Sequence, residues 1–195
     1  MSRRILVVDL HPGTVSFSAA LAQAYLTGAT AAGHDVRTAT LSDMQFDSDL
    51  GQSGFRNSPP LEDDLRQFRD DLGWAGHVTL VSPLWWGGLP AKAKGLIDRT
   101  FLPGFAFDPR IRRMGLPKPL LTGRSARLIL TADTPAWAFR WIYHSALRHQ
   151  MQRQILGFTG IAPMRFTHLA PVEHSTDAIR ARWLATVTAL GRSGG

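Results

Sequence analysis

Short apolar runs alternate along the chain with longer segments whose apolar residues recur at helical spacing. Five runs have the length of a strand and favour β-branched or aliphatic side chains, and we expect strands at residues 4–10, 35–41, 77–83, 126–131 and 162–169. Strands that alternate with helices are typical of a doubly wound parallel sheet with helices on both faces. The pattern therefore predicts a three-layer α/β sandwich whose five-stranded parallel sheet has the order 2-1-3-4-5.

Between these runs the spacing of Ala, Leu and aromatic residues predicts helices at residues 16–32, 61–72, 90–101, 137–156 and 176–190. In two segments the hydrophobic residues recur at neither helical nor strand spacing. Residues 42–60 hold Gly, Ser, Asp, Asn and Pro, and we expect a long loop there, whereas residues 107–123 are expected to form an irregular basic connection. A chain of 195 residues without an internal repeat suits one domain, which we place at residues 1–195.

Charge and composition exclude some classes of protein. The net charge is +7, and the basic excess lies in the middle of the chain. A basic face attracts nucleic acid, an anionic membrane surface or a phosphorylated cofactor. No nucleic-acid motif accompanies it, and a solvated arginine-rich surface explains most of it.

There is no cysteine, and His, Asp and Glu do not cluster at metal-ligand spacing, so we expect no metal. No apolar run approaches the ~20 residues that span a bilayer, so we expect a cytoplasmic protein without membrane insertion.

Three strand-end loops should meet at one rim of such a sheet, namely residues 11–18, 82–89 and 131–137. The first loop places the hydroxyls of Thr14, Ser16 and Ser18 before a helix, where free N–H groups bind phosphate. The same residues also suit a plainly capped helix. Neither G-x-x-x-x-G-K-[ST] nor G-x-G-x-x-G is present, which argues against a P-loop and against a dinucleotide fingerprint.

The second loop is the most distinctive part of the sequence. Trp85 and Trp86 stand beside Gly87 and Gly88 after an apolar strand. Two indoles next to glycines, whose backbone a ligand can approach closely, suit a flat aromatic ligand. The alternative is a buried strand end with core aromatics.

A set of spaced motifs around this loop resembles the NAD(P)H quinone oxidoreductases, which are flavodoxin-like flavoproteins that include the DT-diaphorases and the bacterial modulator-of-drug-activity proteins. The resemblance extends from about Ile5 to Arg182. It depends on Pro83-Leu84-Trp85-Trp86, Pro90-Ala91, Lys94-Gly95, Asp98-Arg99 and Pro103-Gly104-Phe105-Ala106-Phe107.

The resemblance implies a bound flavin and assigns residues to it. His11 and the triplet from Ser16 to Ser18 would hold its phosphate, with Ser18 in place of a frequent Asn. Gly87 replaces a frequent aromatic residue, and Asp133 lies in a partial match that also suits a simple turn. The implied cofactor-binding residues are His11, Thr14, Ser16, Phe17, Ser18, Pro83, Leu84, Trp85, Trp86, Gly87, Thr131, Ala132, Asp133, Thr134 and Arg180.

The implied reaction is hydride transfer from NAD(P)H through flavin N5 to a quinone or similar acceptor. The Tyr and His that the animal enzymes use as proton donors align with Phe139 and Ser145. Tyr143 and His144 are close to these positions but out of register, and His144 is the candidate catalytic residue, the alternative being a buried or surface histidine of a helix. Phe107 and Trp137 are assigned to the substrate pocket, where Phe107 lacks the hydroxyl that relatives have.

Cofactor and assembly are also expectations from the resemblance. Arg180 and the loop at 51–60 favour FAD slightly over FMN, since FAD-binding relatives place an Arg on the last helix. Relatives are usually homodimers, and the aromatic side chains of Phe105, Trp137 and Trp141 suit either such an interface or the core. An alternative function is a flavin-binding ancillary subunit that docks on a membrane transport protein through the basic stretch.

Overall fold

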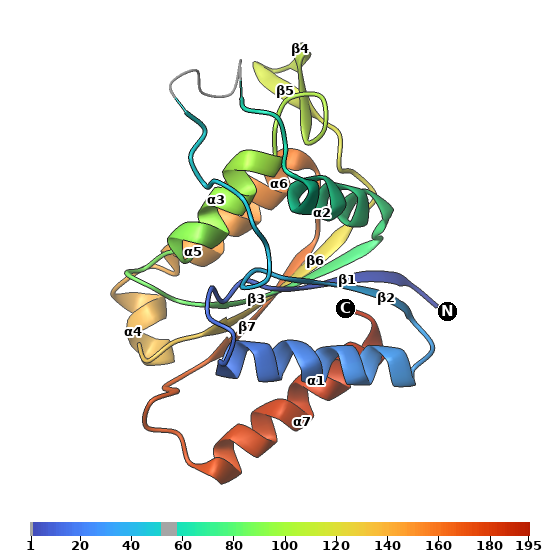
Figure 1. The fold of residues 1–195 in the computed structure, drawn as a ribbon. Helices are drawn as coiled ribbons and strands as arrows, with labels where there is room; N and C mark the ends of the chain where they lie inside the picture. Colours follow the sequence, from blue (N-terminus) through green and yellow to red (C-terminus); the bar gives the residue numbers. More distant parts are fainter. Residues whose placement is uncertain (1, 52–57) are drawn as a thin grey trace.

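The structure is a computed structural model that describes residues 2–51 and 58–195. Its centre is a parallel five-stranded sheet in the order β2-β1-β3-β6-β7 (Figure 1). The strands are β1 (Arg4–Asp9), β2 (Asp35–Thr40), β3 (His77–Pro83), β6 (Ser125–Thr131) and β7 (Met164–Leu169). Numbered among themselves, these strands follow the order 2-1-3-4-5, so the predicted topology is confirmed. The central strand β3 is buried along its whole length, as is typical of a parallel strand whose sheet is covered on both faces.

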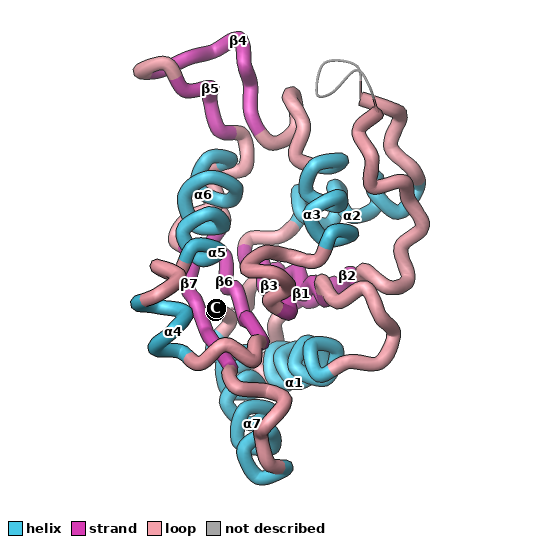
Figure 2. Tube along the Cα trace, turned by 90° about the vertical axis from the view of Figure 1, so that its left-hand side faces the viewer, coloured by secondary structure: helices cyan, strands magenta, loops and turns pink. Residues whose placement is uncertain are grey.

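Helices cover both faces of the sheet (Figures 1 and 2). One face carries α1 (Phe17–Ala31) and α7 (Asp177–Ser193). The other face carries α2 (Asp63–Trp74), α3 (Ala91–Thr100) and the two short helices α5 (Ala146–His149) and α6 (Leu156–Thr159). Each face has its own apolar core. α1 and α7 approach closely because each has a glycine at the contact, Gly28 on α1 and Gly191 on α7. A Cβ on either glycine would collide with the backbone of the opposite helix. No helix in the described ranges is long and apolar enough to cross a membrane.

The prediction of one helix over residues 137–156 is wrong. His144 and Ser145 have φ of 49° and 50°, a left-handed conformation that ends a helix. Phe139 is buried, but Tyr143, one turn later, is 59% exposed, so the buried face resumes only at Leu147. The segment is divided into α4 (Ala136–Trp141), α5 (Ala146–His149), the π-helical stretch η2 (Gln150–Ile155) and α6 (Leu156–Thr159).

The irregular connection expected at 107–123 is also wrong, because an antiparallel hairpin forms there. Its strands are β4 (Phe107–Arg113) and β5 (Leu116–Pro119), and it stands away from the main sheet (Figure 2). Met114 and Gly115, with φ of 53° and 82°, make a two-residue turn whose twist matches paired strands. The prolines in both strands conceal this pattern, since Pro is typical of turns and strand edges.

The long loop after β2 is held by one buried arginine. Arg99 of α3 is 1% exposed, and it donates to Glu62 at 2.8 Å and to the carbonyl oxygen of Pro60 at 3.1 Å. It also donates to the carbonyl oxygen of Asp47. Both ends of the loop are thereby fixed on α3. Residues 52–57, within the segment expected to cover an adenosine, lie outside the described residues.

Candidate active site

Three loops meet at the carboxyl edge of the sheet: the β1 loop (residues 10–16), the β3 loop (84–90) and the β6 loop (132–135). Residues in and beside them form a recess of about 270 Å³, which we name the first recess. It is lined by His11, Val15, Ser16, Phe17, Ser18, Pro83, Leu84, Trp85, Thr131, Ala132, Asp133 and Val172. The structure thus brings together most of the residues that the sequence assigns to cofactor binding.

The β1 loop is ordered by its own hydrogen bonds. Asp9, at the end of β1, accepts from the backbone N–H of His11 at 3.0 Å, and Nδ1 of His11 accepts from the N–H of Gly13 at 3.0 Å. Asp9 is 4% exposed, and this burial is the main reason why its pKa is raised. Ser16 caps α1 by accepting from the N–H of Ala19 at 3.0 Å. The cap satisfies the N–H of Ala19, whereas the N–H groups of Phe17 and Ser18 make no hydrogen bond within the described part of the chain and lie at the wall of the recess.

The β3 loop is a tight turn that presents two indoles. Trp85 and Gly88 exchange backbone hydrogen bonds of 3.0 and 2.9 Å. Trp86 and Gly87 between them have φ of 50° and 76°, and glycine adopts this conformation without strain. Trp85 is 45% exposed and Trp86 is fully exposed. The indoles of this loop therefore face the solvent rather than the core, which decides against the alternative of core aromatics.

Contacts between loops fix their relative positions. The rings of His11 and Trp85 meet edge to face, with centroids 5.7 Å apart. The hydroxyls of Ser18 and Thr131 are 3.4 Å apart and buried. The β1 loop therefore contacts both of its neighbours, so that the first recess has a defined shape before any ligand binds.

A second recess of about 460 Å³ adjoins the first at Leu84. Its polar groups are the Tyr143 and Thr134 hydroxyls and the backbone of the β3 loop. The other side chains are apolar, and the lining consists of Leu84, Trp86, Gly87, Thr134, Phe139, Tyr143, Ala146 and Leu147. A recess lined mainly by apolar and aromatic side chains with a few polar groups suits a planar organic ligand.

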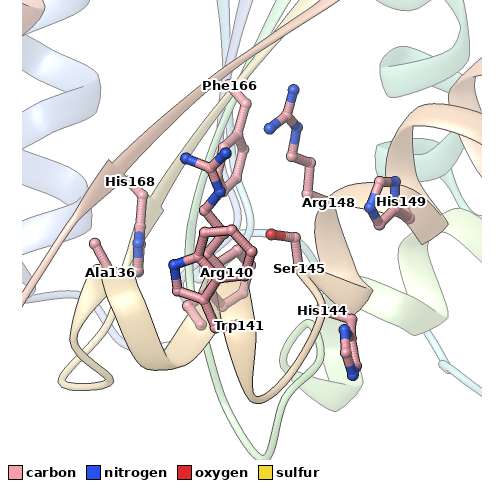
Figure 3. A pocket seen from close by; sticks show the side chains of 10 residues that line it. Ala136, Arg140, Trp141, His144, Ser145, Arg148, His149, Phe166 and His168 are labelled. Carbon is pink, nitrogen blue, oxygen red and sulfur yellow. The ribbon is translucent and has the colours of Figure 1, made fainter.

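A third recess of about 570 Å³ lies between α4, α5 and β7, and it shares Phe139 with the second (Figure 3). His144, the candidate catalytic residue of the sequence, lines this third recess, whereas its neighbour Tyr143 lines the second. The left-handed turn at His144 and Ser145 separates the two side chains.

Four assigned residues line none of these three recesses. Thr14 belongs to the β1 loop, and Trp137 is 62% exposed on α4. Phe107 packs on Phe158, with ring centroids 5.3 Å apart. Arg180 donates to the Ser175 hydroxyl at 2.8 Å and to the carbonyl oxygen of Val172 at 3.2 Å. Its guanidinium also lies 5.9 Å from the Phe17 ring, so it stands directly beside the first recess.

Sequence reasoning missed Val172 and Tyr143. Val172 follows β7, and its N–H donates to the carbonyl oxygen of Ala132 at 3.0 Å. The rule that strand-end loops build the site applies to β7 as well and would have included this loop. Tyr143 lies next to His144 and is close to the aligned positions, but the sequence gave it no role, because the expected continuous helix did not show which way its side chain points.

The first two recesses offer donors that fit a flavin. The N–H groups at the start of α1 suit a phosphate. The N–H groups of Trp86 and Gly87 make no hydrogen bond within the described part of the chain, and the carbonyl and ring-nitrogen acceptors of a flavin would match them. Trp85 offers a half-exposed aromatic surface near the same edge. The residues present therefore fit the group that the sequence resemblance implies.

Comparison with known proteins agrees with this geometry. A family model described as a flavodoxin-like fold matches residues 3–189. The chain belongs to this flavodoxin-like family. A protein of Haemophilus influenzae described as an uncharacterized NAD(P)H oxidoreductase is 34% identical over 179 residues, which are 90% of this chain and 87% of that protein. The resemblance to the NAD(P)H quinone oxidoreductases is thereby confirmed.

Solved structures of similar fold include two enzymes. NAD(P)H:quinone oxidoreductase from Methanothermobacter marburgensis has a TM-score of 0.82 at 24% identity, covering 99% of this chain and 96% of that one. An FMN-dependent NADH-azoreductase from Bacillus anthracis, in complex with FMN, has a TM-score of 0.73 at 16% identity, with 99% of each chain covered. At these identities the likeness establishes the fold of the flavodoxin-like protein.

Proposed function

We propose that this flavodoxin-like protein is a flavin-dependent NAD(P)H oxidoreductase that delivers two electrons to a quinone or a similar planar acceptor. The observation that carries the proposal is the meeting of three strand-end loops around two adjoining recesses, one lined by both polar and apolar side chains and one lined mainly by apolar side chains. NAD(P)H oxidation is the activity named for the Haemophilus influenzae relative, and quinone reduction is named for the Methanothermobacter marburgensis enzyme.

The flavin, when bound, would supply the redox chemistry by accepting hydride at N5 and passing two electrons on. The chain's own part is to bind, orient and polarise. The start of α1 and the capping Ser16 would hold phosphate, while the β3 turn would offer the N–H groups of Trp86 and Gly87 to the edge of the ring. Hydrogen-bond donors aimed at that edge favour the negative charge that develops on reduction.

The second recess would hold the donor and the acceptor in turn. Trp86 and Phe139 offer flat apolar surfaces, and Tyr143 offers a hydroxyl at the same wall. We assign proton donation to Tyr143, and His144 in the adjoining recess is the alternative. We also propose a homodimer, in which the exposed Trp137 and the hairpin residue Phe107 would contribute to the partner's substrate pocket.

We propose FAD as the flavin. Arg180 is held beside the first recess by Ser175 and Val172 and lies over Phe17. Two of its nitrogens donate to the protein, and the remaining one is available to a second phosphate. FMN, the flavin of the azoreductase from Bacillus anthracis, needs no such cation. Acid release of the bound flavin and its chromatographic identification would separate the two.

A second candidate function, an ancillary subunit on a membrane transport protein, is favoured by the β4–β5 hairpin. Its tip exposes Met114 at 95% and Leu116 at 64% beside the basic residues Arg110, Arg112 and Lys118. An apolar tip between cations suits docking on an acidic protein surface.

Steady-state oxidation of NADH and NADPH by the flavin-loaded protein, with and without a soluble quinone, tests the proposed activity. We expect quinone-dependent turnover that the substitution Trp86→Ala slows chiefly by raising the KM for quinone, because the indole is a fully exposed wall of the second recess. Flavin-loaded protein that reduces no quinone would contradict the enzyme assignment and favour the docking function.

A further inference from the structure

The third recess has a larger volume than the first and the second, yet the redox proposal uses it only for the alternative proton donor His144. It shares no residue with the first recess and only Phe139 with the second. Figure 3 shows its side chains coming from three elements, α4, α5 and the edge strand β7. A space of about 570 Å³ is in the range of a small-molecule site.

The recess is strongly cationic. Arg140 and Arg148 reach it from α4 and α5, and no acidic side chain is among its lining residues. Neither arginine forms an ion pair with any residue in the described ranges. Some other arginines, such as Arg37 and Arg99, are instead paired with carboxylates. Two unpaired guanidinium groups at one hollow favour an anion.

Aromatic rings beside the two arginines orient them and provide flat walls. The guanidinium of Arg140 lies 4.9 Å from the ring of Trp141, and that of Arg148 lies 5.5 Å from the ring of Phe166. Stacking on a ring limits the freedom of a guanidinium, so less entropy is lost when it binds an oxyanion. The same rings also offer surface on which a planar group of the ligand can stack.

The wall formed by β7 contains a polar atom without a partner. Nε2 of His168 is buried and makes no hydrogen bond within the described structure. Burial lowers the pKa of His168, so its imidazole is neutral near pH 7 and offers one donor and one acceptor. A buried polar atom normally has a partner, and a polar atom of a bound ligand at this wall would supply it.

We propose that the third recess binds a phosphate monoester of a molecule that also carries a planar ring, with Arg140 and Arg148 as its phosphate ligands. Forked guanidinium groups bind phosphate oxygens in pairs, and a dianion balances two unpaired cations better than a carboxylate does. Two sources present this chemistry. One is NADPH, whose 2′-phosphate would lie in the third recess while its nicotinamide occupies the second recess on the other side of Phe139. This source rests on the proposed function. The other is a separate phosphorylated aromatic metabolite.

Calorimetric titration of the flavin-loaded protein with phenyl phosphate tests the site without requiring turnover. The variants are Arg140→Gln, Arg148→Gln and the double variant, and Arg182→Gln on α7 is the matched control, because it removes the same charge from an exposed position on the other face of the sheet. We expect each single variant to weaken phenyl phosphate binding about tenfold, the double variant to abolish it and the control to leave it unchanged. Circular dichroism verifies that these exposed substitutions leave the fold intact.

Steady-state kinetics with NADPH and NADH identify the source. If the recess holds the 2′-phosphate, the double variant lowers kcat/KM for NADPH and leaves that for NADH unchanged. If both values are unchanged while phenyl phosphate binding is lost, the ligand is a separate phosphate ester. A protein without oxidoreductase activity would still report phosphate binding by calorimetry, so the two proposals fail separately. Absence of phenyl phosphate binding, or equal binding by the double variant and the control, overturns the proposed site.

Discussion

The imidazole of His11 meets the indole of Trp85 edge to face, with ring centroids 5.7 Å apart and an interplanar angle of 80°. The two residues follow different strands, β1 and β3, and their contact joins the proposed phosphate end of the site to the proposed ring end. Edge-to-face pairs contribute about 0.5–1.5 kcal/mol beyond the area that they bury. The contact therefore couples the shape of one strand-end loop to that of the other.

His11→Ala should weaken flavin binding about tenfold, because it removes this contact and the acceptor for the Gly13 N–H. Fluorescence titration of the flavin-free protein with FAD and FMN measures the change. His34→Ala, whose side chain lies at the opposite edge of the sheet beside Arg3, is the control and should keep wild-type affinity. Equal affinity in both variants would show that the β1 loop does not hold the cofactor.

Tyr143 and His144 are adjacent in sequence but line different recesses, which allows a paired test of proton donation. Tyr143→Phe removes one hydroxyl from the second recess and should lower kcat for quinone by about tenfold or more. His144→Gln should leave kcat nearly unchanged. The opposite ranking would return the role to His144, and two unaffected variants would indicate that water supplies the proton.

The contact between α1 and α7 has no room for a methyl group. A Cβ on Gly28 would collide with the backbone oxygen of Thr188, so Gly28→Ala should reduce the free energy of unfolding by about 3 kcal/mol. Gly73→Ala in α2 is the matched control, because nothing lies within 4 Å of a Cβ there. It should stabilise the helix by up to about 1 kcal/mol. Urea denaturation of both variants measures the difference, and equal stabilities would contradict the close packing.

His77 makes stability depend on pH. It is 1% exposed, and burial, with the nearby Arg3, Arg127 and Arg165, lowers its pKa from 6.5 to about 4. The unfolded chain therefore binds a proton before the folded one does, and stability is lost as pH falls from 6.5 towards 4. The loss should approach roughly 3 kcal/mol at the acid end.

Denaturant unfolding of wild type and His77→Gln across that pH range measures this loss. His77→Gln should reduce the loss of unfolding free energy between pH 6.5 and pH 4. His149→Gln, at an exposed position of α5, should show the same loss as wild type. Parallel curves for wild type and His77→Gln would mean that His77 titrates normally in the folded protein.

The sheet and the first recess could be predicted because their signals are local. β1 and β3 are short apolar runs that end in polar or glycine-bearing turns, and parallel topology then brings those turns together. The single-helix prediction at 137–156 failed because the apolar residues Trp141 and Tyr143 continue the composition of a helix while facing solvent. The break depends on the left-handed turn at His144 and Ser145, which no glycine marks.

The third recess was beyond prediction for a different reason. Arg140 and Arg148 lie in the predicted helix, but Phe166 and His168 lie on a strand more than a dozen residues away. Only the folded chain places α4 and α5 against the edge of β7. In the sequence, Arg140 and Arg148 are only two of many basic residues in the middle of the chain, and nothing there indicates that they line one recess.

The central claim is that the chain binds a flavin at the first and second recesses, and the visible absorption spectrum of the purified protein, with identification of the released chromophore, tests it most directly. The account predicts a yellow protein with about one flavin per chain, the flavin being FAD. It also predicts that the flavin-free protein recovers this spectrum when FAD is added. A colourless protein that binds neither FAD nor FMN on addition would contradict the account.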